Sequence, residues 1–143
     1  MMVSALALAL VTAPLTTTEP EVWLLAVGAN DGLLDEEPLR FAVDDAERYA
    51  RTLAKVGGLR PEHTQVLIQP KPDDVRAALR QIADKTSRLS TPPIVHFYYS
   101  GHGDRDTLHL GPKRLSIEEL QSSLAEISAR DRFVVLATCR RAP

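Results

Sequence analysis

The chain has 143 residues, a formal net charge of -2, 44% hydrophobic and 25% charged residues, and a single cysteine. This length corresponds to about one domain with its own core, and the composition is ordinary for a globular protein. The near-neutral charge gives no reason to expect a nucleic-acid partner, and one cysteine excludes an internal disulfide and a cysteine-based metal cluster.

An apolar N-terminal segment and a linker occupy residues 1–20, and the domain proper spans residues 21–143. The apolar stretch is too short to cross a membrane as a helix, so we expect no stable membrane span. Residues 1–13 have the apolar centre and small-residue end of a signal peptide, but no Lys or Arg precedes them. Export to a periplasm after cleavage and a cytoplasmic location without cleavage therefore both stay open.

Strands and helices are expected to alternate along the rest of the chain. Short apolar runs, rich in β-branched and aromatic residues, predict strands at 22–28, 65–68, 94–100 and 133–137. Apolar residues at helical spacing predict helices at 39–56, 73–89 and 117–127, and residues 107–115 read as a hairpin. This order predicts a three-layer α/β fold, with a mostly parallel sheet and helices on both faces.

Two residues with chemical potential follow strands that the sheet would place side by side. His102 lies between Gly101 and Gly103 after one apolar run, and Cys139 follows the next. Sites form at the carboxyl ends of parallel strands, and an imidazole near a thiol favours the reactive thiolate. The plain alternative is a small buried cysteine and a glycine corner. Of the other histidines, we expect His63 on the surface, and His96 and His109 in structural positions.

The motif Tyr98–Gly103, followed by a helix, a strand and Cys139, resembles the caspase-like cysteine peptidases of the caspase and metacaspase type (peptidase C14), in a bacterial-metacaspase-like form. The likeness runs from about Val22 to Cys139 and includes the Asp-Ala signature within 39–46. It implies the caspase-like fold and a cysteine endopeptidase with His102 and Cys139 as its catalytic dyad. Protein or peptide would be the substrate. It also implies an oxyanion donor near Gly103, and no cofactor apart from the calcium that some relatives need.

The resemblance also bears on which peptide bond would be cut. The metacaspase branch cleaves after Arg or Lys with an acidic pocket, a role that falls on Asp45, with Asp44 as a neighbouring candidate. The caspase branch uses arginine to bind an acidic residue, and Arg40 lies near that place. Alternatively, both aspartates are solvated residues in the first turns of a helix.

The sequence also departs from the family pattern. Ala137 stands where an acidic residue commonly precedes the nucleophile, and the sequence ends four residues after Cys139. We therefore expect C-terminal strands to be missing, as in a fragment, a processed subunit or a degenerate relative. A C-terminal remainder or a partner would complete the fold, and the chain alone would be a poor peptidase. The alternative is an inactive pseudo-peptidase that serves as a binding or regulatory module.

A third function class, a small-molecule-binding α/β module, rests on the segment 28–32. Its two glycines follow the first strand, where a helix N-terminus could hold a phosphate, but the lysine of a P-loop is missing. A plain loop is the competing interpretation.

Overall fold

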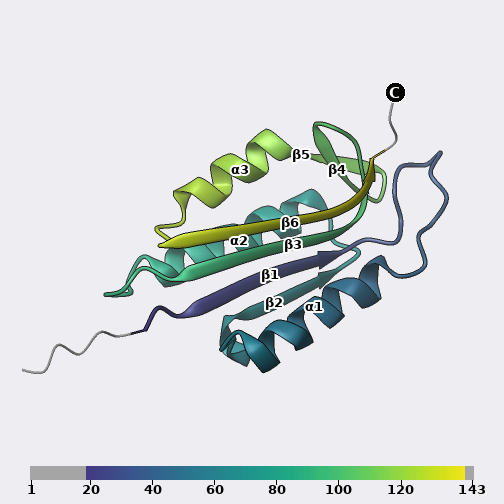
Figure 1. Ribbon diagram of the computed structural model, residues 1–143. Coiled ribbons are helices and arrows are strands. Elements are labelled where there is room, and N and C mark those ends of the chain that lie inside the picture. Colours follow the sequence, from purple (N-terminus) through teal and green to yellow (C-terminus); the bar gives the residue numbers. More distant parts are fainter. Residues whose placement is uncertain (1–18, 141–143) are drawn as a thin grey trace, which may run out of the picture.

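The computed structural model describes the backbone of residues 19–140 and the side chains up to Thr138 (Figure 1). The signal-peptide prediction for residues 1–13 lies outside the described residues. Within 19–140, no helix has the length and apolar character needed to cross a membrane.

The described chain has the element order that the sequence predicts, with a short 3-10 turn at Pro61–His63 added before the second strand. The strands and helices are β1 (Val22–Gly28), α1 (Ala42–Val56), β2 (Thr64–Ile68), α2 (Pro72–Thr86), β3 (Ile94–Gly103), β4 (Thr107–Leu110), β5 (Lys113–Ser116), α3 (Ile117–Glu126) and β6 (Asp131–Arg140).

Four parallel strands form the main sheet in the order β2, β1, β3, β6, and the antiparallel hairpin β4–β5 joins it through β3. Helix α1 covers one face, while α2 and α3 cover the other (Figure 1). Each face has its own core: Leu24 and Ala26 pack against α1, whereas Leu25 and Phe97 pack among α2 and α3 residues. The predicted three-layer α/β fold is confirmed.

The third strand is longer than predicted. We expected it to stop at Ser100 with a glycine corner beyond, but β3 continues through His102 to Gly103. The reason is pairing with β6, which runs in register along the whole of β3. Gly101 serves close packing here, because a Cβ atom at that position would lie 2.6 Å from Cζ of the Tyr99 ring.

The helix starts also differ from the periodicity-based prediction. Helix α1 begins at Ala42, and Leu39 lies in the preceding loop, where its amide donates to the Asn30 carbonyl. The Asn30 side chain in turn accepts a bond from the Val43 amide at 3.1 Å and so satisfies the first turn. Leu89 lies beyond the end of α2 at Thr86.

The prediction of a surface position for His63 is wrong. The residue is buried, and its ring stacks on Trp23 with 4.1 Å between the ring centroids. His63 is the last residue of the 3-10 turn Pro61–His63, and this turn places its ring against Trp23. The polar residues around His63 gave no indication of this buried position. His109 is buried on β4, as expected for a structural residue.

Candidate active site

His102 and Cys139 lie opposite each other on neighbouring parallel strands. The register of β3 and β6 pairs the two residues directly, at the carboxyl end of the sheet. Strands in a sheet are about 4.8 Å apart, so the two backbones are immediate neighbours. The side chain of Cys139 is outside the described part of the chain.

The His102 ring is held by a backbone carbonyl from a distant loop. Its Nε2 atom lies 2.9 Å from the carbonyl oxygen of Glu37, in the long connection between β1 and α1. A carbonyl only accepts hydrogen bonds, so Nε2 carries the proton and the neutral ring keeps Nδ1 as its basic nitrogen. The side chain is only 14% exposed, which limits competition from water.

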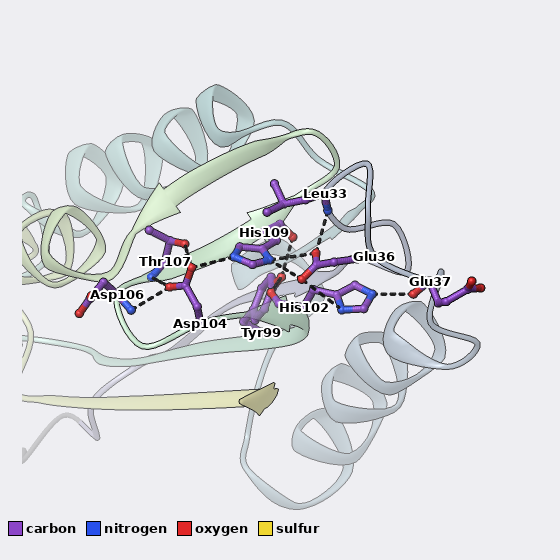
Figure 2. A network of polar contacts seen from close by, with 9 residues as sticks. All are labelled: Leu33, Glu36, Glu37, Tyr99, His102, Asp104, Asp106, Thr107 and His109. Atoms are coloured by element: carbon purple, nitrogen blue, oxygen red, sulfur yellow. Dashed lines mark hydrogen bonds and ion pairs between the residues drawn. The ribbon is translucent and has the colours of Figure 1, made fainter. Parts of the chain in front are cut away.

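A chain of polar contacts continues from His102 (Figure 2). The Glu36 carboxylate lies 3.8 Å from Nδ1 of His102 and 2.9 Å from Nδ1 of His109. On the far side of the His109 ring, Nε2 lies 3.1 Å from the Asp104 carboxylate. The sequence pattern contained no signal for this cluster, because its members come from three separate segments.

Both carboxylates of the cluster are held in the ionised form. Burial raises the pKa of Glu36, but bonds from the Leu33 amide and His109 outweigh it, and the net shift is downward. The pKa of Asp104 lies far below its ordinary range, chiefly because the Asp106 amide donates to it. His109 and Thr107 add further bonds to the same carboxylate.

The loop of residues 29–41 is fixed at several points besides the histidines. The Gln69 side-chain carbonyl accepts bonds from the amides of Asn30 and Asp31, and the Gly111 amide bonds to the Asp31 carbonyl at 3.2 Å. The amides of Asn30 and Asp31 are therefore already occupied, which favours the plain-loop interpretation of segment 28–32.

Two cavities flank the carboxyl ends of the strands and share Leu39. One, of about 360 Å³, is lined by Glu36–Leu39, His102–Asp104 and His109. The other, of about 450 Å³, lies between the start of α1 and the ends of β3 and β6. Its lining includes Arg40, Asp45, Ser100 and Ala137.

The structure thus brings most of the sequence-predicted site residues to one end of the sheet. Asp45 and Arg40 line the same cavity, and the Asp45 carboxylate lies 3.7 Å from Arg48 and 3.5 Å from the Ser100 hydroxyl. Asp44 is an exposed residue in the first turn of α1 and is not part of that lining. Gly103 is buried in β3, next to His102.

The charge of Asp104 should support folding at neutral pH but not in acid. A carboxyl with a depressed pKa contributes stability above its ordinary value, here 3.8, and loses it as the pH falls toward the folded-state value. We expect Asp104→Asn to lower the unfolding temperature at neutral pH, with a difference from wild type that shrinks below about pH 4. Thermal unfolding followed by circular dichroism measures this. The exposed Asp106→Asn is the matched control, and a difference that stays constant down to about pH 2 would contradict the expectation.

Within the described side chains, no three His, Cys, Asp or Glu residues form a group that could hold a metal ion. Calcium dependence stays an untested prediction.

The fold is an α/β domain with a mostly parallel main sheet, and a histidine and a cysteine are paired at the carboxyl ends of two neighbouring strands. The caspase-domain family model of peptidase C14 matches residues 22–141. The chain therefore belongs to the caspase-domain family. No curated protein matches it.

A solved structure shares the fold. The crystal structure of protein GSU0716 from Geobacter sulfurreducens superposes with a TM-score of 0.64 at 22% sequence identity. The match covers 85% of this chain and 50% of the other, so the chain spans about half the length of that protein. At this identity the likeness concerns the fold alone.

Proposed function

We propose that the protein is a cysteine endopeptidase in which Cys139 and His102 form the catalytic dyad. The observation that carries this proposal is the direct pairing of the two residues at the carboxyl end of β3 and β6. The bond from His102 Nε2 to the Glu37 carbonyl supports it, because that bond leaves Nδ1 free to exchange protons. Membership of the caspase-domain family supplies the reaction class.

The proposed reaction follows from these groups. Nδ1 of His102 takes the proton of the Cys139 thiol, and the thiolate attacks the carbonyl carbon of the scissile peptide bond. The resulting oxyanion accepts backbone hydrogen bonds, for which the Gly103 region and the Cys139 amide are the candidates. His102 then gives its Nδ1 proton to the amine, which leaves as the C–N bond breaks. The acyl group stays on Cys139 as a thioester, and a water molecule hydrolyses this thioester to regenerate the thiol.

Alkylation of the single cysteine tests the dyad without requiring a known substrate. At about pH 6.5 a free thiol is only about 1% ionised, so an imidazole partner raises the thiolate fraction by up to about 100-fold. A thiol of lower pKa is a weaker nucleophile, which reduces the expected gain in rate to about tenfold. We expect iodoacetamide to label wild type about tenfold faster than His102→Ala at this pH. Equal rates in the two proteins would rule out the dyad.

For substrate preference we propose cleavage after Arg or Lys, with Asp45 binding the basic side chain. Asp45 lines the cavity beside the strand ends, and its carboxylate is 39% exposed. A charge-assisted bond to a substrate guanidinium or ammonium would replace the present contact with Arg48. Arg40 lines the same cavity and would favour an acidic residue instead.

A fluorogenic peptide library separates these two preferences. Asp45→Ala should lower kcat/KM for Arg and Lys substrates by at least about tenfold, the value of one charge-assisted bond. Asp44→Ala removes the same charge from a residue outside the cavity lining and should change kcat/KM far less. A wild-type preference for Asp that disappears in Arg40→Ala would favour the caspase-type pocket.

The second candidate function is that of a peptide-binding pseudo-peptidase. Ala137 favours it, because this residue lines the cavity and offers no carboxylate there. A peptide that binds to the wild-type protein but is never cut, with alkylation independent of His102, would support this alternative.

We further propose that another polypeptide segment, contributed by a C-terminal remainder or by a partner, pairs with β6. Among the described strands, β6 pairs only with β3, and its residues Phe133, Val134 and Val135 are 39–50% exposed. Long apolar edge strands are normally covered. The match covers only 50% of the solved structure's chain, so that protein has room for additional strands beyond the matched part.

A further inference from the structure

We propose that Glu36 and His109 are positioning residues for the His102–Cys139 pair. In this role they form a charge chain with Asp104 that holds the His102 ring and stabilises its protonated form. The inference rests on the proposed peptidase function and adds to it the means by which the imidazole is kept in place.

The His109 ring lies between two carboxylates. Its Nδ1 atom lies 2.9 Å from both oxygens of Glu36, and its Nε2 atom lies 3.1 Å from the Asp104 carboxylate. Ionised carboxylates only accept hydrogen bonds, so both contacts are satisfied only when both ring nitrogens carry protons. His109 is thus buried between two carboxylates, 4% exposed as a residue.

The His109 ring fixes the Glu36 carboxylate in a single place. Glu36 also accepts a bond from the Leu33 amide at 2.7 Å, so His109 and the backbone hold its head group from two sides. One of its oxygens then faces Nδ1 of His102 at 3.8 Å, the nitrogen that would gain a proton from the thiol. A negative charge at that distance favours the protonated imidazole, and therefore the thiolate.

The same contacts hold the backbone of the site. Glu36 immediately precedes Glu37, whose carbonyl oxygen bonds Nε2 of His102. The buried Tyr99 hydroxyl lies 2.6 Å from the His102 carbonyl oxygen and 2.8 Å from that of His109. The loop 29–41 is thus anchored beside both histidines, and the sticks in Figure 2 show Glu36 lying between the two rings.

The variant Glu36→Gln tests this role, because it keeps the size of the side chain and removes its charge. Asp35→Asn is the matched control: it removes the same charge one residue earlier, from an exposed side chain. His109→Gln is the second variant, and it interrupts the chain of charges one step further from His102. Cys139 is the only cysteine in the sequence, so the rate of alkylation by iodoacetamide reports on this one thiol.

The rates are compared at two pH values. At about pH 6.5 the thiolate depends on the imidazolium, whereas at about pH 9.5 a thiol is ionised without help. We expect Glu36→Gln and His109→Gln to react at least about threefold more slowly than wild type at the lower pH. All proteins should react within about twofold of each other at the higher pH. Asp35→Asn should match wild type at both.

Three results would overturn the inference. Wild-type rates for Glu36→Gln at both pH values would show that its charge does not act on the pair. Equal slowing at both pH values would show a loss of folding or access instead of an electrostatic effect. Two-dimensional NMR of the histidine side chains gives a readout independent of the thiol: a neutral His109 ring at about pH 7 would remove the central link. By contrast, equal rates for wild type and His102→Ala would refute the dyad itself, a different result from any of these.

Discussion

Gly32→Ala is expected to abolish most of the proposed peptidase activity although residue 32 carries no side chain of its own. A Cβ atom at this position would lie 2.6 Å from Cδ2 and 2.9 Å from Cγ of the His102 ring, and would also overlap a carboxylate oxygen of Glu36. The ring and the carboxylate cannot both stay in place. Misplacing a catalytic group by about 1 Å can cost about 100-fold in rate, so we expect kcat/KM for a cleavable peptide to fall by about that factor.

Gly58→Ala is the matched control for this substitution. Its Cβ meets no atom within 4 Å, but its φ of +67° makes the change unfavourable for the backbone, at a cost of about 1 kcal/mol. It should therefore lower the unfolding temperature while the activity per folded molecule stays unchanged. Alkylation of Cys139 gives the same comparison without a substrate. Undiminished activity in Gly32→Ala would show that the His102 and Glu36 positions described here do not matter for the reaction.

Phe97→Ala is expected to have the largest effect on stability. The side chain is 1% exposed in the core between β3 and the α2 and α3 helices. Truncating a fully buried phenylalanine leaves a cavity and typically costs about 3–5 kcal/mol in the free energy of unfolding. Urea denaturation followed by circular dichroism measures this loss.

Phe133→Ala makes the same change on the neighbouring strand and tests the edge of the sheet. Phe133 is 50% exposed on β6 and stacks on His96 with 4.8 Å between the ring centroids. If β6 is a free edge in solution, truncating the Phe133 side chain should lower the free energy of unfolding by only about 1 kcal/mol, since such aromatic contacts contribute about 0.5–1.5 kcal/mol. A loss as large as that of Phe97→Ala would mean that another segment or a second copy covers β6 in the protein tested.

The order of elements was readable from the sequence because each element carries a local pattern. The strand β1 has the bounds predicted from its apolar run, Val22–Gly28. Ser116 caps α3 by accepting a hydrogen bond from the Glu119 amide. The hairpin turn at Gly111 likewise has the positive φ, +61°, that favours glycine. Patterns of this kind depend on neighbours a few residues apart, and the sequence contains that information directly.

The parts that the sequence did not predict depend on contacts between distant segments. The extension of β3 through His102 is set by pairing with β6. The glycines on either side of His102 therefore led to the wrong prediction that the strand ends at Ser100. The Glu36, His109 and Asp104 cluster joins the β1–α1 loop to the hairpin and carries no motif. His102 and Cys139 were recognisable as candidates because the motif around His102 resembles that of a family. Their exact pairing follows only from the register of the two strands.

The bonds that hold the His102 ring span long stretches of chain, which has a consequence for how the protein matures. The Glu37–His102 contact closes a separation of 65 residues, and the Glu36–His109 contact one of 73. Contacts of such sequence separation are costly in chain entropy and tend to form late in folding. A molecule with its helices formed but its β1–α1 loop still detached would lack a positioned imidazole. The enhanced reactivity proposed for Cys139 would therefore arise only in the last stage of folding, and a newly made chain would carry an ordinary thiol until its tertiary structure is complete.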